Sequence, residues 1–231
     1  MKYPTRIDIP IENVKEVSST NEYLTHLCEK NKAQEFYTII ADHQLEGKGQ
    51  RGNSWESESG KNLLFSIVLY PTALEANKQF YLSMLTAISI IDALSKYTDG
   101  FSIKWPNDIY WNDCKIAGIL IENELQGTYI TRSIIGVGLN INQEVFLSDA
   151  PNPVSLKQII GVDINRSELF QKILHGIVAS YRLLEEDFEK MAATIRILYQ
   201  KCLYRRNGYY PYKDAEGLFM AQFEHIDSLG R

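Results

Sequence analysis

Residues 116–139 read IAGILIENELQGTYITRSIIGVGL, and this stretch decides the fold class. Two mainly apolar segments flank Gln126-Gly127, which is typical of a tight turn between antiparallel strands. The hairpin stands among helices grouped elsewhere in the chain, so the pattern predicts an α+β fold with a mixed or antiparallel sheet and packed helices, rather than a parallel doubly wound sheet. Apolar spacing predicts further strands at 36–41, 62–70 and 102–105, and helices starting at 18–21 and spanning 79–97, 166–185 and 188–203.

The composition is that of a globular protein, with 45% hydrophobic and 23% charged residues in a chain of 231. We expect one large domain over 1–203 and a small β segment over 204–231. A net charge of −5 argues against a dedicated DNA- or RNA-binding surface. No apolar run is long enough for a membrane span, and the N-terminus does not read as a signal peptide. Cys28, Cys114 and Cys202 lack metal-ligand or disulfide spacing, so we expect a cytoplasmic protein without zinc.

The pentapeptide Lys104-Trp105-Pro106-Asn107-Asp108 follows a predicted strand. Pro106 cannot donate to a sheet ladder, so it marks the exit of that strand. A lysine, an amide and a carboxylate at such an exit can converge on an anionic ligand or a metal. The alternative is a polar turn between two strands.

The segment Gly47-Lys48-Gly49-Gln50-Arg51-Gly52 combines glycines with two cations. Glycines let the backbone present N–H groups at close range, and the cations suit a carboxylate or phosphate. The segment is neither a P-loop nor a dinucleotide-binding fingerprint. The alternative is a flexible, solvated loop. Trp55 could cover a bound ligand or anchor the loop to the core.

Paired glycines inside a strand, as in Gly136-Val137-Gly138, indicate close approach of a ligand or a backbone. Gly138, Asn140 and Asn142 share one face at period two, opposite an apolar face. A bulged strand entering an Asn-rich turn is the alternative. Taken alone, Lys115 is interpreted as a solvated lysine at the start of a strand. Residues 19–21 alone are interpreted as a helix cap.

These segments, in this order, resemble a biotin–protein ligase. The resemblance covers about residues 15–205 and rests on five motifs. They are Ser19-Thr20-Asn21; Gln44 with residues 47–52 and Trp55; residues 104–108; Lys115 to Glu122; and residues 136–140.

The resemblance implies a class II synthetase-like catalytic fold followed by an SH3-like β segment at 204–231, which would end one strand short. It also implies ATP and Mg²⁺ as cofactors and biotin as substrate. Biotin and ATP would give biotinyl-5′-adenylate, and the acyl group would pass to a lysine of a biotin carboxyl carrier domain. An acyl adenylate needs no protein nucleophile, which fits the lack of a Ser/His/Asp set in the sequence.

The resemblance also implies roles for individual residues. Biotin would be bound by Ser19, Thr20, Asn21, Gln44, Lys48, Gly49, Gln50 and Lys115. ATP would be bound by Arg51, Trp55, Asn107 and Asn140. The catalytic residues would be Lys115, Arg51, Lys104 and Asp108, with Asp108 and Asn140 as metal ligands.

This chain departs from the family at the glycine loop, where Lys48 and Gln50 stand at positions that are commonly arginine. Because the motifs begin by residue 18, we expect no N-terminal DNA-binding domain and no repressor role. A lipoate- or octanoate-transferring relative of the same fold and a non-catalytic biotin-binding relative are the alternatives. The sequence leaves the oligomeric state open, with a homodimer as one option.

Overall fold

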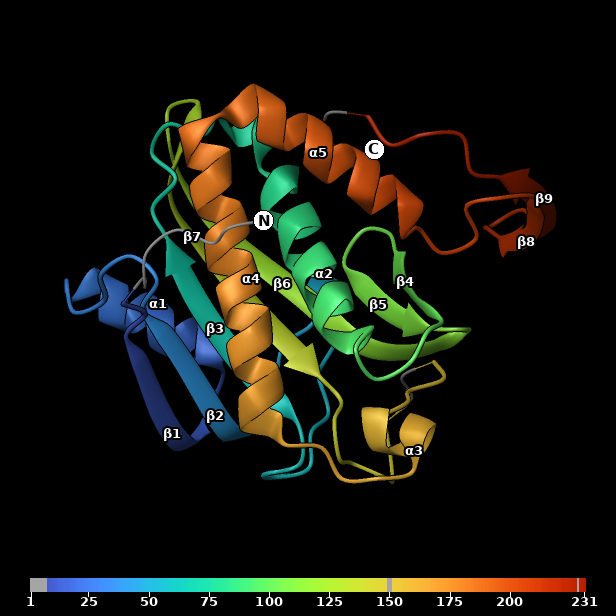
Figure 1. The fold of residues 1–231 in the computed structure, drawn as a ribbon, viewed down its shortest axis with the longest axis horizontal. Coiled ribbons are helices and arrows are strands. Elements are labelled where there is room, and N and C mark those ends of the chain that lie inside the picture. The colour runs from blue at the N-terminus through green and yellow to red at the C-terminus, as the bar shows by residue number, and fades with distance from the viewer. Residues whose placement is uncertain (1–7, 149–150, 228) are drawn as a thin grey trace.

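The computed structural model describes residues 8–148, 151–227 and 229–231, and within them seven strands form one sheet. Figure 1 shows the sheet behind a layer of helices. The strand order is β1-β2-β3-β7-β6-β5-β4. The strands are β1 (Ile11–Val17), β2 (Thr38–Gln44), β3 (Leu63–Leu69), β4 (Phe101–Lys104), β5 (Asp108–Trp111), β6 (Cys114–Gln126) and β7 (Tyr129–Leu139).

The sheet is mixed, since β1 and β2 run parallel and the other neighbouring strands run antiparallel. The predicted hairpin is the β6–β7 pair, with Gln126 opposite Tyr129. The α+β prediction is therefore confirmed. Sequence patterning did not find β1 or β5, because β1 is an edge strand rich in polar residues and β5 has only four residues.

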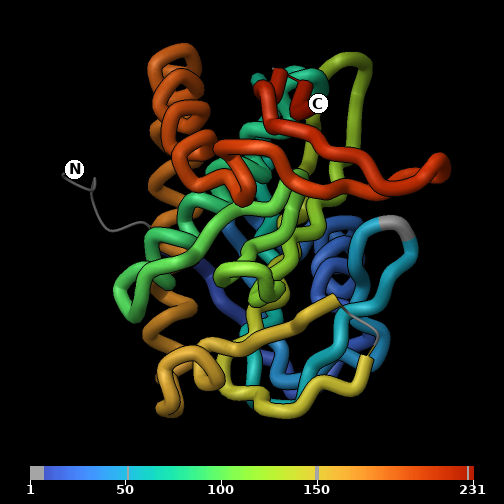
Figure 2. The backbone as a smooth tube through the Cα atoms, turned by 90° about the vertical axis from the view of Figure 1, so that its right-hand side faces the viewer, coloured from blue at the N-terminus to red at the C-terminus, as the bar shows by residue number. Residues whose placement is uncertain are grey.

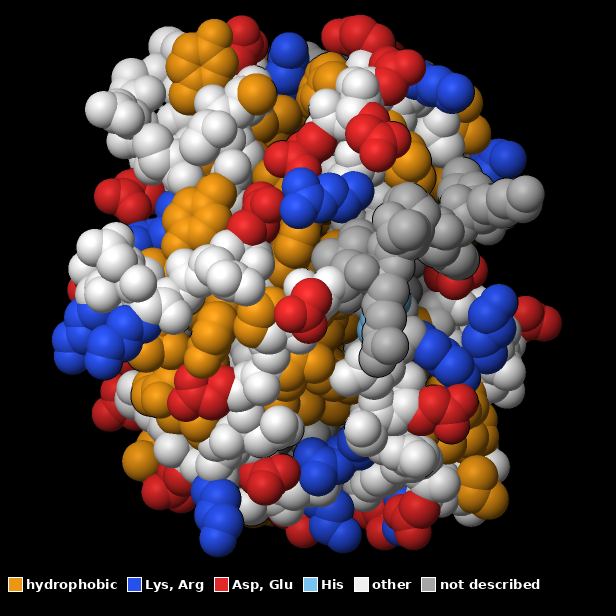
Figure 3. Space-filling view, turned by 60° about the vertical axis from the view of Figure 1, so that its left-hand side comes forward, with side chains coloured by type: hydrophobic (Ala, Val, Ile, Leu, Met, Phe, Trp, Pro, Cys, Tyr) orange, Lys and Arg blue, Asp and Glu red, His pale blue; other side chains and the backbone are white. Residues whose placement is uncertain are grey.

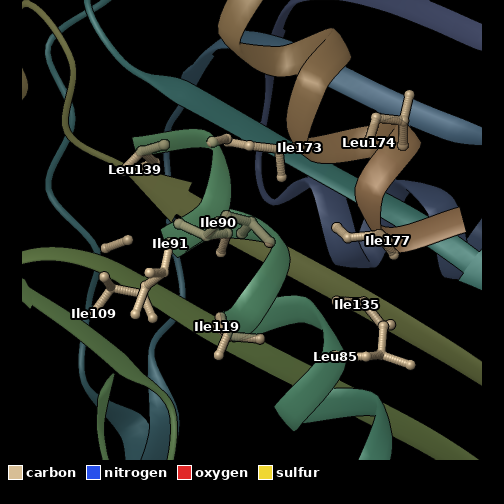
Figure 4. Packing of buried hydrophobic residues seen from close by; sticks show 14 of the residues in the cluster. Leu85, Ile90, Ile91, Ile109, Ile119, Ile135, Leu139, Ile173, Leu174 and Ile177 are labelled. Carbon is tan, nitrogen blue, oxygen red and sulfur yellow. The ribbon is translucent and has the colours of Figure 1, made fainter. Parts of the chain in front are cut away.

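One face of the sheet is covered by α2 (Phe80–Leu94), α4 (Arg166–Glu186) and α5 (Phe188–Lys201). Figure 4 shows how Leu85 and Ile90 of α2 and Ile173 of α4 point into the same core as Ile135 of β7. Helix α2 is apolar on most of its surface because it lies between the sheet and the two later helices. The large core therefore occupies one side of the sheet.

The other face carries α1 (Thr20–Glu29) and a smaller core. Leu24 of α1 packs there with Ile39, Val68 and Ile134, which alternate along their strands with residues of the large core. Figure 2 shows α1 and the loop of residues 45–60 on the side of the sheet away from α4. Near β6 and β7, this face of the sheet carries mainly glycines and polar residues.

The C-terminal part follows the short helix α3 (Leu156–Ile160), α4 and α5. Strands β8 (Tyr209–Lys213) and β9 (Leu218–Gln222) form a separate two-stranded sheet. Figure 2 shows this hairpin reaching out on the same side as the 45–60 loop. Phe223 and Ile226 then pack against the large core. A domain boundary at 203/204 and an SH3-like character stay predictions.

None of the described helices combines the length and the apolar character needed to cross a membrane. On the face drawn in Figure 3, acidic and basic side chains are interspersed among apolar ones. Such mixing is typical of the surface of a globular domain.

Candidate functional site

A cavity of about 310 Å³ lies on the sheet face opposite the large helices. Its walls come from the start of α1, the glycine loop, the β4–β5 turn and the middle of β6 and β7. Most of the residues that the sequence singled out line it, namely Ser19, Thr20, Asn21, Gln44, Lys48, Gly49, Gln50, Trp55, Asn107, Asp108 and Lys115. Segments that are far apart in the chain therefore meet at one place.

The charged end of the cavity is an ion pair between Lys115 and Asp108, whose nitrogen and oxygen lie 2.7 Å apart. Asp108 begins β5 and lies opposite Gly118 of β6, while Lys115 lies at the start of β6. Both side chains are mostly buried, with 23% and 20% of their surface exposed. Screening by water is reduced at such a site, so the ammonium group can stabilise an anionic ligand strongly.

Beside this pair, the indole ring of Trp55 lies over strands β6 and β7. A β-carbon on Gly138 would come within 2.4 Å of the Trp55 ring, and one on Gly118 within 3.0 Å. The Lys115 nitrogen lies 5.6 Å from the centre of the same ring. The indole nitrogen of Trp55 is buried without a hydrogen-bond partner among the described residues. Gly138, which was predicted to allow close approach, thus makes room for the ring, and so does Gly118.

The opposite end of the cavity is a network of neutral polar groups. The Thr20 backbone N–H and hydroxyl both donate to Gln44 Oε1, at 2.8 and 3.0 Å. The hydroxyl of Ser66, from β3, lies 2.7 Å from the Thr20 hydroxyl and 2.6 Å from Asn21 Oδ1. These groups offer donors and acceptors without net charge, which suits a small polar ring.

Asn21 is held in one orientation. Its amide nitrogen donates to Glu122 Oε2 at 2.6 Å and to the Leu120 carbonyl at 3.3 Å. A β-carbon on Gly136 would lie 2.2 Å from Asn21 Oδ1, so only glycine fits opposite this amide. Sequence reasoning did not single out Ser66 or Glu122, although Ser66 is a polar residue in an otherwise apolar strand.

The glycine loop is ordered by its own backbone. The Gly49 N–H donates to the Asn53 carbonyl and the Trp55 N–H to the Gly47 carbonyl, each at 2.7 Å. The Lys48 ammonium forms an ion pair with Glu22 of α1. The hydrogen bond from Lys48 lowers the pKa of Glu22, and the same bond raises the pKa of Lys48. The side chain of Arg51 lies outside the described part of the chain.

Two predicted residues lie elsewhere. Lys104 stands opposite Asp108 in the β4–β5 register, but its ammonium reaches the Tyr110 hydroxyl at 3.0 Å and lines a second cavity. Asn140 is buried outside the lining of the first cavity, where its amide nitrogen donates to the Val154 carbonyl at 3.2 Å. Among the described residues, neither side chain forms a hydrogen bond or ion pair with Lys115 or Asp108.

The chain matches the model of the biotin/lipoate A/B protein ligase family over residues 14–140. It is 32% identical over 176 residues to the bifunctional ligase/repressor BirA of Bacillus subtilis, covering 72% of this chain and 52% of that protein. It is 35% identical over 108 residues to the biotin–[acetyl-CoA-carboxylase] ligase of Paracoccus denitrificans, covering 45% of this chain and 43% of that protein. The chain spans about half the length of these curated relatives.

Among solved structures, the chain is similar to the biotin protein ligase from Aquifex aeolicus in complex with biotin and ATP. The TM-score is 0.77 at 26% identity, and the match covers 96% of this chain and 89% of that one. A biotin protein ligase from Leishmania major in complex with biotin has the same fold, with a TM-score of 0.71 at 18% identity and coverage of 94% and 100%.

Proposed function

The chain belongs to the biotin/lipoate A/B protein ligase family, and from this premise we propose that it is a biotin–protein ligase. It joins biotin to ATP as biotinyl-5′-adenylate and then transfers the biotinyl group to a lysine of a carrier protein. The proposal is carried by one observation: a single cavity holds a neutral polar end and a charged end formed by the Lys115–Asp108 ion pair. Similarity to a ligase solved with biotin and ATP supports the same assignment.

The neutral end is proposed to hold the ureido ring of biotin. That ring has two N–H donors and one carbonyl acceptor, and the network of Thr20, Gln44 and Asn21 supplies groups of both kinds. Ser19 lies at the same end of the cavity and belongs to the proposed set. Ser66 and Glu122 support the set from behind by fixing the Asn21 amide.

The charged end, at Lys115 and Asp108, is proposed to hold the reacting groups. A biotin carboxylate oxygen attacks the α-phosphorus of ATP, and the bond to the β-phosphate oxygen breaks to release pyrophosphate. Charge develops on the phosphoryl oxygens, and the Lys115 ammonium lies where it can stabilise that charge. Trp55, which lies against Gly118 and Gly138, is proposed to contact the nucleotide, and Lys48, Gly49 and Gln50 are proposed to contact the phosphates. A role for Arg51 stays a prediction.

The second step needs only a neutral amine. The acceptor lysine attacks the acyl carbon, AMP leaves with the bonding electrons, and the amine loses one proton. Asp108 is the carboxylate of the cavity and is proposed to orient this amine. The contributions of Lys104, Asn107 and Asn140 to catalysis or nucleotide binding stay predictions.

Mg²⁺ is proposed only as an ion that accompanies ATP. Within the described residues, no three His, Cys, Asp or Glu side chains form a cluster that could hold a metal. Asp108 is paired with Lys115, and Asn140 does not line the same cavity. Asp108 and Asn140 as metal ligands therefore stay a prediction, and Mg²⁺ usually keeps water and phosphate ligands in nucleotide sites.

The acceptor is proposed to be a biotin carboxyl carrier domain, and the location is proposed to be the cytoplasm. The free thiols of Cys28, Cys114 and Cys202 fit a reducing compartment. The ligase proposal is tested by incubating the protein with ATP, an apo carrier domain and either biotin or lipoate, then weighing the carrier by intact mass spectrometry. We expect a mass gain with biotin; a gain with lipoate alone, or with neither acid, would overturn the proposal.

A further inference from the structure

A second cavity, of about 590 Å³, lies beside the first. Its walls come from β4 and β5, the segment after α5, β8 and the C-terminal tail. Trp105 lines both cavities, and its indole N–H donates to the Gly230 carbonyl at 2.8 Å. The β4–β5 turn therefore separates the two cavities, and a molecule in the second cavity lies next to the mouth of the first.

The second cavity carries positive charge, although the chain as a whole is acidic. Lys104 bonds only a neutral group, the Tyr110 hydroxyl, and Lys213 has no ion pair within the part of the chain that the structure describes. Asp113, the one described acidic side chain of the lining, is already engaged by the Tyr204 hydroxyl and lies 3.9 Å from Arg205. Unpaired cations therefore face the cavity.

Aromatic rings complete the lining. The Arg205 guanidinium lies 5.0 Å from the centre of the Tyr204 ring, and the Lys104 nitrogen lies 4.7 Å from that of Tyr110. Burial, together with the hydrogen bond to Asp113, raises the pKa of Tyr204 to about 12, so its hydroxyl stays protonated at neutral pH. Tyrosine and arginine are enriched in protein–protein interfaces, where they often contribute most of the binding free energy.

We propose that this second cavity docks an acidic surface segment of the acceptor protein and thereby brings the acceptor lysine to the first cavity. The proposal rests on the proposed ligase function. Unpaired Lys104 and Lys213 provide charge complementarity to aspartate or glutamate side chains, and the shared Trp105 wall provides the proximity. Electrostatic attraction of this kind mainly raises the rate of productive encounter.

The test is the charge-reversal variant Lys213→Glu, compared with Lys96→Glu, which makes the same charge change at an exposed lysine outside both cavities. Three rates are measured: pyrophosphate release from ATP and biotin, acyl transfer to hydroxylamine, and acyl transfer to an apo biotin carboxyl carrier domain. For the cavity variant we expect kcat/KM for the carrier domain to fall by about tenfold. Its other two rates should match those of the control.

The wild-type kcat/KM for the carrier domain should also fall more steeply with added salt than that of the cavity variant. Equal carrier transfer by the cavity variant and the control would overturn the docking proposal. Loss of pyrophosphate release in the cavity variant would overturn it too, because the cavity would then serve the nucleotide. Failure of the ligase function itself looks different, since the wild-type protein would then release no pyrophosphate.

Discussion

The indole ring of Trp55 lies directly on Gly138, where a β-carbon would come within 2.4 Å of the ring. The Gly138→Ala substitution therefore adds a methyl group to an occupied space, and overpacking of this kind costs about 1–3 kcal/mol. We expect a lower melting temperature and a higher KM for ATP. The control is the same substitution in a Trp55→Ala background, where the methyl group has room. An equal loss in both backgrounds would show that the ring is not the cause.

Gly136 has the corresponding relationship with Asn21, whose Oδ1 would lie 2.2 Å from an added β-carbon. Gly136→Ala should displace the Asn21 amide from Glu122 and raise the KM for biotin by about tenfold, roughly the effect of one lost hydrogen bond to a charged group. Steady-state kinetics with each substrate varied in turn distinguish the two glycines. Gly136→Ala should affect biotin and Gly138→Ala should affect ATP. The same KM pattern in both variants would contradict this division.

Lys115 is the cation closest to the proposed reaction. Removing one stabiliser of developing charge typically lowers a rate by about 10²–10³-fold, and we expect this loss of pyrophosphate release for Lys115→Ala. Lys15→Ala, at an exposed position of β1, is the matched control. Pyrophosphate release at the wild-type rate by the Lys115 variant would remove this residue from the mechanism.

The Lys48–Glu22 ion pair joins the glycine loop to α1. Both side chains are nearly half exposed, so water screens the pair and its contribution to stability is small. Glu22→Gln frees Lys48 for the phosphates, so we expect the KM for ATP to fall about twofold. Glu29→Gln, on the same helix, is the control. A rise in KM would mean that the pair instead orders the loop for binding.

The pH dependence of this effect follows from the pKa of Glu22, which its hydrogen bond from Lys48 lowers. A lowered carboxylate pKa means that the contact is fully formed above the ordinary carboxylate range and is lost as the pH falls through the lowered pKa. The ratio of KM values between wild type and Glu22→Gln should therefore be constant from about pH 6 to pH 8. A ratio that changes across this range would assign the effect to another group.

Local patterns in the sequence predicted the β6–β7 hairpin and the buried helices, because these features depend on periodicity. The family resemblance, not local pattern, indicated most of the polar residues that line the first cavity. No role was predicted for Ser66 or Glu122, because their importance comes from contact with Asn21 across more than forty residues of chain. The paired glycines indicated a close approach, yet only the structure identifies the approaching groups as Trp55 and Asn21.

The contact made by Lys104 also could not be predicted from local sequence patterns. Its register position opposite Asp108 places both on one sheet face, but a long side chain can reach several neighbours, and here it reaches Tyr110. The second cavity also depends on the C-terminal segment folding back beside the β4–β5 turn. Long-range packing of this kind leaves no local pattern in the sequence.

The first cavity is proposed to make biotinyl-5′-adenylate. The most direct measurement is a single-turnover reaction of the protein with ATP and biotin in the absence of any acceptor, with pyrophosphate counted and the bound product identified by mass spectrometry. We expect one pyrophosphate per biotinyl-5′-adenylate, formed only when both substrates are present and lost in Lys115→Ala. Absence of pyrophosphate and of biotinyl-5′-adenylate from the wild-type reaction would contradict it.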